Sequence, residues 1–283
     1  MKSIIHGNTT VFGSVSAIIA VFCFSTNDVA IKFISDDYAL HLVILIRSLV
    51  GLTVLFLFIV PFSGGLPTLH TNRLGLHLLR GFCVVFANIT FFLGLAALPL
   101  AEGVAIFFIS PLLITVFSVL FLKEFVGPRR WAAVIIGLIG VVVVLRPGSA
   151  TFQTASLLPL LAAFGYATLH MLTRYIGKTE SAASMSFYIQ ITFLIVCLMF
   201  GVTVGDGKFS GGSDPSLEFL FRAWSWPSSN HYLILILIGA SSAFGGFFIS
   251  QAYRISEAAV VAPFEYIALP IAIFWGVIVF GDW

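Results

Sequence analysis

Long apolar runs follow one another along the chain, separated by short segments that are polar or contain Pro and Gly. A hydrocarbon core about 30 Å thick is crossed by about 20 helical residues, and nine runs come close to this length. They cover residues 11–34, 40–62, 74–97, 102–122, 131–147, 156–176, 184–205, 231–253 and 258–280. Transmembrane barrels instead show alternating segments of about ten residues. The pattern therefore predicts an all-α membrane protein with nine visible helices.

The composition and the placement of cations agree with a bilayer as the surroundings. Hydrophobic residues make up 59% of the chain and charged residues 9%, too few to cover a soluble domain. With the N-terminus in the cytoplasm, nine cations lie inside, namely Lys2, Arg73, Arg80, Lys123, Arg129, Arg130, Arg174, Lys178 and Arg254. Four lie outside: Lys32, Arg146, Lys208 and Arg222. This asymmetry favours a cytoplasmic N-terminus in a bacterial inner membrane or plasma membrane. The net charge of +2 reflects this topology and indicates no nucleic-acid partner.

The two halves of the chain share a weak repeat. Phe92, Ala97 and Glu102 match Phe247, Ala252 and Glu257 at a shift of 155, Glu124 matches Asp282 at 158, and Lys32-Phe33-Ile34 matches Arg174-Tyr175-Ile176 at 142. A unit of five helices has an odd number of crossings, so a second copy enters the membrane upside down. We therefore expect an inverted repeat of five transmembrane helices per half, with units 1–150 and 151–283. Chance similarity between apolar helices is the alternative.

Further motifs surround the repeat. They are Leu79-Arg80-Gly81, the stretch from Leu95 to Glu102, Ser110-Pro111, Lys123-Glu124, Arg130-Trp131, Gly137, Gly140, Arg146-Pro147-Gly148, Gln251-Ala252-Tyr253, Ser256-Glu257-Ala258, Ala262-Pro263, Glu265-Tyr266 and Gly281-Asp282. Together they resemble the ten-helix, two-repeat branch of the drug/metabolite transporter superfamily, with EamA-type domains. The resemblance implies cytoplasmic termini and transport of small organic metabolites. That family places a tenth helix after Gly281-Asp282, so we expect the second unit, which stops at Trp283, to be C-terminally incomplete.

Ionisable residues inside a bilayer cost roughly 2.5–3.5 kcal/mol on insertion scales and usually have a function or a partner. Asp28 and Arg47 both lie about 9–11 Å below the outer end of their helices, counted at 1.5 Å per residue. They are expected either to form an ion pair that fixes helix packing or to serve a substrate or a proton. Lys32, four residues after Asp28, is a competing partner. A substrate carboxylate would meet Arg47, and an amine would meet Asp28 or Glu265.

A second candidate group lies at the inner depth. His170 takes the place of Asp28 in the second half, and Glu265 comes out at a similar depth. The two would suit proton-linked transport, because histidine titrates near neutral pH. The alternative is a core histidine that hydrogen-bonds a backbone carbonyl. Gln190 takes roughly the place of Arg47, and the further hydrogen-bonding candidates are Asn27, Asn88 and Tyr266.

Backbone features add candidates for movement. Pro111, Pro263 and Pro270 should kink their helices, which suits gating as well as passive curvature. Small residues at 239–243 and 245–246 allow close helix packing and leave a homodimer open.

The motif search excludes an enzyme. The segment 201–208 resembles a phosphate-binding loop but has one residue too many, and no H-E-x-x-H or G-x-S-x-G motif occurs. No metal site or cofactor is expected. The sequence thus favours a secondary transporter that moves amino acids, organic acids or related solutes by alternating access, with proton coupling as one mode of driving. The alternatives are uptake of an aromatic vitamin or nucleoside-derived metabolite and, in another class, a non-transporting membrane scaffold.

Overall fold

The computed structural model describes residues 2–128, 131–132, 135–136, 139–140, 142 and 154–281. The predicted helix at 131–147 lies largely outside these residues, as does Asp282 of the repeat. The helices are α1 (Lys2–Phe33), α2 (Leu40–Val54), α3 (Val60–Phe62), α4 (Leu74–Ala97), α5 (Leu100–Phe107), α6 (Ile109–Leu122), α8 (Leu157–Ile176), α9 (Ala182–Val204), α10 (Pro215–Phe221), α11 (Tyr232–Ile255), α12 (Ala258–Val261) and α13 (Ala268–Trp275). Short 3₁₀ or π-helical turns extend or join several of them.

Eight helices in the described ranges are long and apolar enough to cross a membrane. They are Val11–Phe33, Leu40–Phe62, Leu74–Ala97, Leu100–Leu122, Thr154–Ile176, Ala182–Val204, Ser229–Ile255 and Ala258–Phe280. Every bound lies within two residues of the corresponding apolar run. No strand occurs among the residues that the structure describes. The prediction of an all-helical membrane fold is confirmed.

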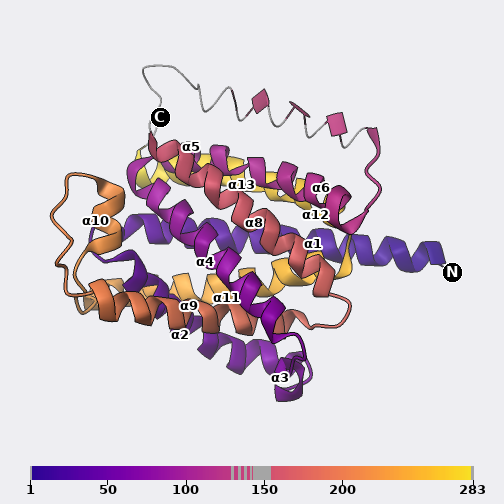
Figure 1. The fold of residues 1–283 in the computed structure, drawn as a ribbon, viewed down its shortest axis with the longest axis horizontal. Coiled ribbons are helices and arrows are strands. Elements are labelled where there is room, and N and C mark those ends of the chain that lie inside the picture. Colours follow the sequence, from indigo (N-terminus) through magenta and orange to yellow (C-terminus); the bar gives the residue numbers. More distant parts are fainter. Residues whose placement is uncertain are drawn as a thin grey trace.

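Helices from the two halves of the chain interlock in one bundle (Figure 1). α1 packs along α11, and α4 packs along α8. α2 contacts both α9 and α11, and α9 also contacts α4. α5 and α6 lie against α8, while α12 and α13 lie against α1. The most extensive helix–helix contacts among the described residues therefore join the two halves.

Glycines allow the close approach of α11 to its neighbours. A Cβ atom on Gly239 would lie 2.4 Å from Cβ of Val50 in α2. One on Gly245 would lie 2.9 Å from the ring of Phe24 in α1. Real side chains do not tolerate such distances, so small residues are required here. This stripe is used for packing inside the chain, and a homodimer remains a prediction.

The outward faces of the helices are strongly apolar. Phe82, Val202 and Leu233 are largely exposed although they lie in regular transmembrane helices. In water such a surface would be costly, whereas lipid tails solvate it. The surface pattern thus agrees with a helix bundle that faces lipid.

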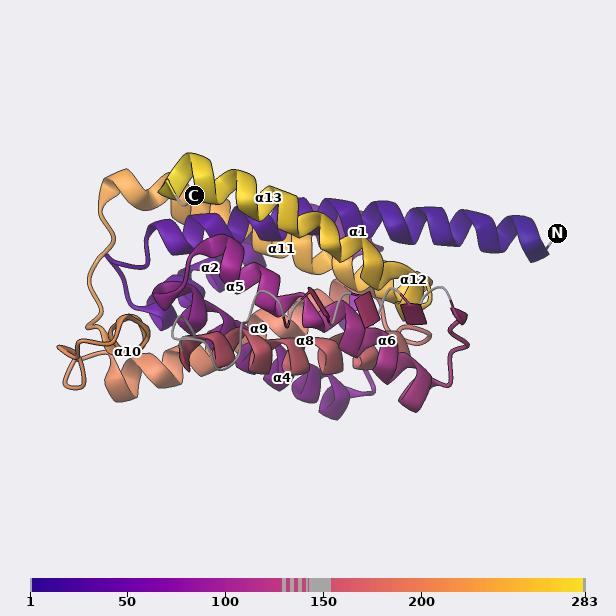
Figure 2. The same ribbon diagram turned by 90° about the horizontal axis from the view of Figure 1, so that it is seen from above.

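The two ends of the bundle can be named by their residues. At one end of the bundle, α4 begins close to His77, and α8 and α11 end there as well. We call this the His77 end. At the opposite end of the bundle, α1 ends at Phe33, directly after Lys32. The short helix α10 lies at this end too (Figure 2). We call this the Lys32 end.

Candidate functional site

An internal cavity of about 150 Å³ lies between the two halves of the bundle. This volume counts only the space open to the centres of water molecules, and one water needs about 10–15 Å³ of such space. The cavity therefore holds roughly 10–15 waters, which occupy about 300–450 Å³ as liquid. Small-molecule sites fall in the range of about 300–1,000 Å³. Side chains from α1, α2, α4, α5, α6, α8, α9 and α11 and from the segment around Glu265 line it. The cavity is large enough for a metabolite.

Most of the polar residues singled out in the sequence face this cavity. They are Asn27, Asp28, Arg47, Asn88, His170, Gln190 and Glu265. Tyr266 does not line it and packs edge to face on Phe108, with ring centres 5.3 Å apart. The fold therefore gathers residues from five α-helices and from the 3₁₀ segment Ala262–Ile267, although their role in binding stays a prediction.

Asp28 and Arg47 occupy the Lys32 end of the cavity. The Asp28 carboxylate accepts a hydrogen bond from the Asn27 amide at 3.2 Å. Nη1 of Arg47 donates to Oδ1 of Asn88 at 2.8 Å, and its guanidinium carbon lies 4.5 Å from the ring centre of Phe193. Among the described residues, no carboxylate oxygen lies within 4.0 Å of an Arg47 nitrogen. The expected ion pair between Asp28 and Arg47 is therefore not formed.

Lys32 is directed elsewhere. Its Nζ donates to the carbonyl oxygens of Leu95 and Leu98, each at 2.8 Å, at the C-terminal end of α4. A cation is favourable at this position because helix C-termini carry partial negative charge. These contacts anchor the end of α1 to the end of α4.

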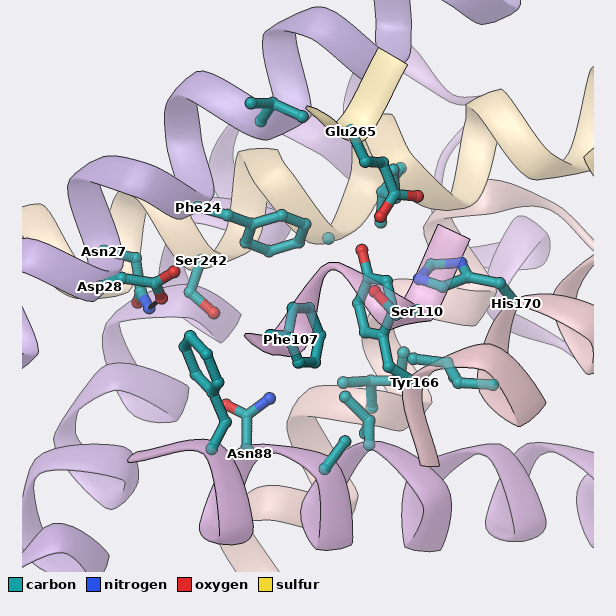
Figure 3. A pocket seen from close by; sticks show the side chains of 18 of the residues that line it. Phe24, Asn27, Asp28, Asn88, Phe107, Ser110, Tyr166, His170, Ser242 and Glu265 are labelled. Carbon is teal, nitrogen blue, oxygen red and sulfur yellow. Dashed lines mark hydrogen bonds between the residues drawn. The ribbon is translucent and has the colours of Figure 1, made fainter. Parts of the chain in front are cut away.

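Glu265 and His170 lie toward the other end of the cavity, with Phe24 and Phe107 between them and Asp28 (Figure 3). The hydroxyl of Tyr253 donates a hydrogen bond to Oε1 of Glu265. The His170 ring stacks on Tyr253 at 4.2 Å between ring centres. Tyr253 thus connects the two predicted residues, and the sequence analysis had not selected it.

Several buried polar atoms of the cavity wall have no hydrogen-bond partner in the described part of the chain. These are both ring nitrogens of His170, Oδ1 of Asn27, Oε1 of Gln190, Nε of Arg47 and the hydroxyls of Ser110 and Ser186. His170 therefore does not bond a backbone carbonyl, the alternative that the sequence left open. Buried polar groups without partners are rare and usually face a ligand or water.

Arg80 is a functional candidate that the sequence analysis placed wrongly. It was counted with the cations of inner loops and helix ends, whereas it lies inside α4, fully buried, and lines the cavity. Its Nε donates to Oγ1 of Thr173 at 3.1 Å, and Nη1 donates to the carbonyl of Met185 at 3.5 Å. One feature of the sequence could have indicated this burial. Arg80 lies seven residues after Arg73, so a helix that begins between the two carries Arg80 into its second turn.

Aromatic rings separate the two polar ends. Phe107 lies 4.8 Å from Phe91 and 5.1 Å from Tyr166, measured between ring centres. All three line the cavity together with Phe24. Such a wall suits the faces of a flat ring.

The proline positions coincide with irregular helix. α5 and α6 are separated at Phe108, three residues before Pro111. Pro263 lies in a 3₁₀ segment, Ala262–Ile267, that also carries Glu265. Pro270 lies in the first turn of α13. A gating role for these positions remains a prediction.

Polar contacts between the halves close the His77 end. Nε2 of His77 lies 3.1 Å from Oε2 of Glu180, and both side chains are buried. Nε of Arg174 donates to Oε1 of Glu124 at 3.0 Å, and Nη1 donates to the carbonyl of Arg254 at 3.3 Å. These pairs could not be predicted from the sequence, because their members are up to 103 positions apart.

The Lys32 end is closed by a separate set of contacts. The hydroxyl of Ser216 in α10 donates to the carbonyl of Leu93 at 2.6 Å. Nη1 of Arg222 donates to the carbonyl of Ser35 at 2.7 Å. Tyr38 and His231 form a further hydrogen bond at 2.9 Å. The cavity therefore lies between two separate sets of polar contacts, one toward each end of the bundle.

A helix bundle with lipid-facing surfaces and a polar, aromatic-walled cavity in its interior is typical of a multi-spanning membrane transporter of small molecules. Comparisons with known proteins agree. Residues 11–146 match the EamA-like transporter family, and the chain belongs to this family, as the resemblance implied.

Relatives named for uptake of metabolites cover most of the chain. An S-adenosylmethionine uptake transporter of Rickettsia conorii is 29% identical over 91% of this chain and 81% of its own length. A riboflavin transporter of Brucella anthropi is 31% identical over 77% of this chain and 72% of its own. A crystal structure of 16% identity covers 98% of this chain and 90% of that one with a TM-score of 0.65, which shows a shared fold.

Proposed function

We propose that this chain is a secondary transporter that carries a nucleoside-derived or vitamin-like metabolite with a flat, polar ring system. The observation that carries the proposal is the cavity: aromatic side chains line its middle, and polar groups without partners line both ends. A flat ring with polar edges satisfies both features.

The names of the relatives favour this reading over amino acids or simple organic acids. The Rickettsia protein is named for S-adenosylmethionine and the Brucella protein for riboflavin. Both metabolites contain a flat nitrogen heterocycle. The alternative that the sequence analysis ranked second thus becomes the proposal.

Transport proceeds in this proposal by alternating access between the units 1–150 and 151–283. The packing supports a two-fold relation between them. If α1, α2 and α4 correspond to α8, α9 and α11, the contact of α1 with α11 corresponds to that of α8 with α4. The contact of α2 with α11 likewise corresponds to that of α9 with α4.

A pair of cations supports the same relation. Lys32 donates to the carbonyls at the end of α4, and Arg174, its match in the repeat, donates to the carbonyl of Arg254 at the end of α11. The two contacts lie at opposite ends of the bundle, as an inverted repeat requires.

Proton coupling is the proposed driving mode, through Glu265 and His170. The support is geometric, because Tyr253 bonds the carboxylate and stacks on the imidazole. The proposed setting is a bacterial inner or plasma membrane with a cytoplasmic N-terminus. Without the buried Arg80, the cation count is eight inside and four outside, which keeps the asymmetry.

The test is uptake into sealed vesicles that carry the purified chain. Labelled S-adenosylmethionine, riboflavin, amino acids and organic acids are offered with and without an imposed pH gradient. We expect saturable flux of a ring-containing solute that follows the gradient and loses its gradient dependence in Glu265→Gln. Flux of amino or organic acids alone would refute the substrate class. A non-transporting scaffold would move no solute.

A further inference from the structure

The two charged groups at the Lys32 end of the cavity are not neutralised by each other. Asp28 is bonded through the neutral amide of Asn27, and Arg47 through the neutral amide of Asn88. Both face the same cavity, and no ion pair joins them among the described residues. A buried charge without a counter-charge costs several kcal/mol, so this end is complementary to a ligand that carries both signs.

Resting on the proposed function, we infer that the substrate carries a zwitterionic α-amino-acid head group joined to its flat ring, and that Asp28 and Arg47 bind this head group. Asp28 receives the ammonium and Arg47 the carboxylate. The ring lies between Phe24 and Phe107 and directs its polar edge to the Glu265 end. Asp28 and Arg47 are thus the specificity-determining residues of the cavity.

The donor geometry of Arg47 fits a carboxylate. In the described structure only Nη1 donates, to Asn88, and Nε is buried without a partner. Nε and Nη2 form one edge of the guanidinium, and this edge binds a carboxylate through two parallel hydrogen bonds. The ring of Phe193 beneath the guanidinium holds its plane.

The Glu265 end does not offer the same opportunity. Glu265 already accepts from Tyr253, and Arg80 already donates to Thr173 and Met185. The remaining groups at this end, His170 and Ser110, are polar and lack partners. Such groups suit the donors and acceptors at the edge of a heterocycle. The head group and the ring edge are therefore assigned to opposite ends.

The overall charge of the cavity agrees with a zwitterion. The described residues that line it include two carboxylates, Asp28 and Glu265, and two guanidiniums, Arg47 and Arg80. Their formal charges cancel, so a head group that brings one charge of each sign leaves the balance unchanged. A neutral ring compound would leave Asp28 and Arg47 without counter-charges.

The test compares two ligands that share a nucleoside and differ in the head group, with a different flat-ring compound as a third probe. Binding to the purified full chain in lipid nanodiscs is measured by calorimetry for three probes. S-adenosylhomocysteine has a nucleoside and a free α-amino acid, 5′-methylthioadenosine has the same nucleoside without the amino acid, and riboflavin has a flat ring without a head group. We expect S-adenosylhomocysteine to bind at least about tenfold more tightly than 5′-methylthioadenosine, as charged hydrogen bonds contribute this much.

Variants assign the effect to residues. Asp28→Asn and Arg47→Gln should each weaken S-adenosylhomocysteine by about tenfold or more and leave 5′-methylthioadenosine nearly unchanged. Asp206→Asn and Lys208→Gln, which make the same kinds of change in an exposed ion pair away from the cavity, are the matched controls and should leave binding of both ligands unchanged. If the Arg47 variant fails to fold, analogues of S-adenosylhomocysteine that lack only the amine or only the carboxylate test the same contacts on the unchanged chain.

The outcomes separate this inference from the proposed function. Equal binding of S-adenosylhomocysteine and 5′-methylthioadenosine, or tighter binding of riboflavin that ignores both variants, overturns the head-group assignment and leaves a ring transporter. Binding of none of the three probes overturns the proposed substrate class itself, and the assignment with it.

Discussion

The contact between His77 and Glu180 is predicted to set how often the His77 end of the cavity opens. Oε2 of Glu180 lies 3.1 Å from Nε2 of His77 and also accepts from the Ser184 hydroxyl at 3.4 Å. The imidazole is fully buried, and its Nδ1 has no partner among the described residues. Glu180→Ala therefore leaves neither ring nitrogen of His77 bonded while this end is closed.

The size of the effect follows from that buried group. A buried polar group left without its hydrogen bond costs about 1–3 kcal/mol. The cost applies only to the closed arrangement, because water reaches His77 once the end opens. A bias of about 1–3 kcal/mol changes the ratio of open to closed molecules by roughly 5–150-fold.

Thiol labelling from each face of the membrane measures this ratio. Ser110, whose hydroxyl faces the cavity without a partner, is replaced by Cys in a chain that carries Cys23→Ala, Cys83→Ala and Cys197→Ala. A membrane-impermeant thiol reagent is then applied to vesicles of either orientation. Glu180→Ala should raise the labelling rate from the His77 face by roughly 5–150-fold, because the rate follows the open population.

Two controls make the result specific. Glu180→Gln keeps an acceptor oxygen for His77 and should label at close to the parent rate. Glu218→Ala removes a carboxylate at the Lys32 end, where it bonds the amide of Gly211, and should leave the His77 face unchanged. Equal labelling of folded Glu180→Ala and the parent chain would refute the closure role of this contact.

Three further predictions follow from packing, ion pairing and the aromatic wall. Gly239→Ala should destabilise the bundle by about 1–3 kcal/mol through overpacking against Val50. Gly75→Ala, with no atom within 4 Å of the added Cβ, should be neutral or slightly stabilising. Similar melting temperatures for the two variants would contradict the packing argument. Arg174→Ala should lower the melting temperature by roughly 2–4 °C, which corresponds to about 1 kcal/mol, because it loses the contact with Glu124. Lys208→Ala should not change the melting temperature, because the pair of Lys208 with Asp206 is exposed. Equal shifts in the two variants would count against a structural role for Arg174. Phe107→Leu should weaken the uptake affinity for S-adenosylmethionine or riboflavin by roughly 2–13-fold, because about 0.5–1.5 kcal/mol of ring contact is lost. Phe82→Leu, on a lipid-facing surface, should leave this affinity unchanged. An unchanged KM in Phe107→Leu would exclude stacking of the substrate on Phe107.

The membrane spans could be predicted almost to the residue because their signal is local. A run of about 20 apolar residues is required by the thickness of the bilayer, whatever the neighbouring helices are. The polar candidates could be named for a similar reason. Asp28, Arg47, His170 and Glu265 are conspicuous in apolar surroundings, and the fold does bring all four to one cavity.

Contacts between distant segments could not be predicted in the same way. Asp28 and Arg47 were predicted to lie at one depth, and both line the same cavity. They form no ion pair, since depth does not specify the direction in which each side chain points. Lys32 turned out to bond the end of α4. Arg80 was taken for a helix-end cation, because a difference of a few residues along a helix decides between interface and interior.

The chain's apolar runs were sufficient to predict a helical membrane protein, and its rare charges indicated a polar interior; the repeat of two units remains a prediction. Whether two polar residues meet depends instead on the rotation of each helix about its axis and on the neighbour it packs against. Those are decided by side-chain packing across the bundle, such as Gly239 on Val50 and His170 on Tyr253. Only the tertiary structure therefore shows that Asp28 and Arg47 hydrogen-bond neutral amides and form no ion pair, while Glu265 accepts from Tyr253 and Arg80 donates to Thr173.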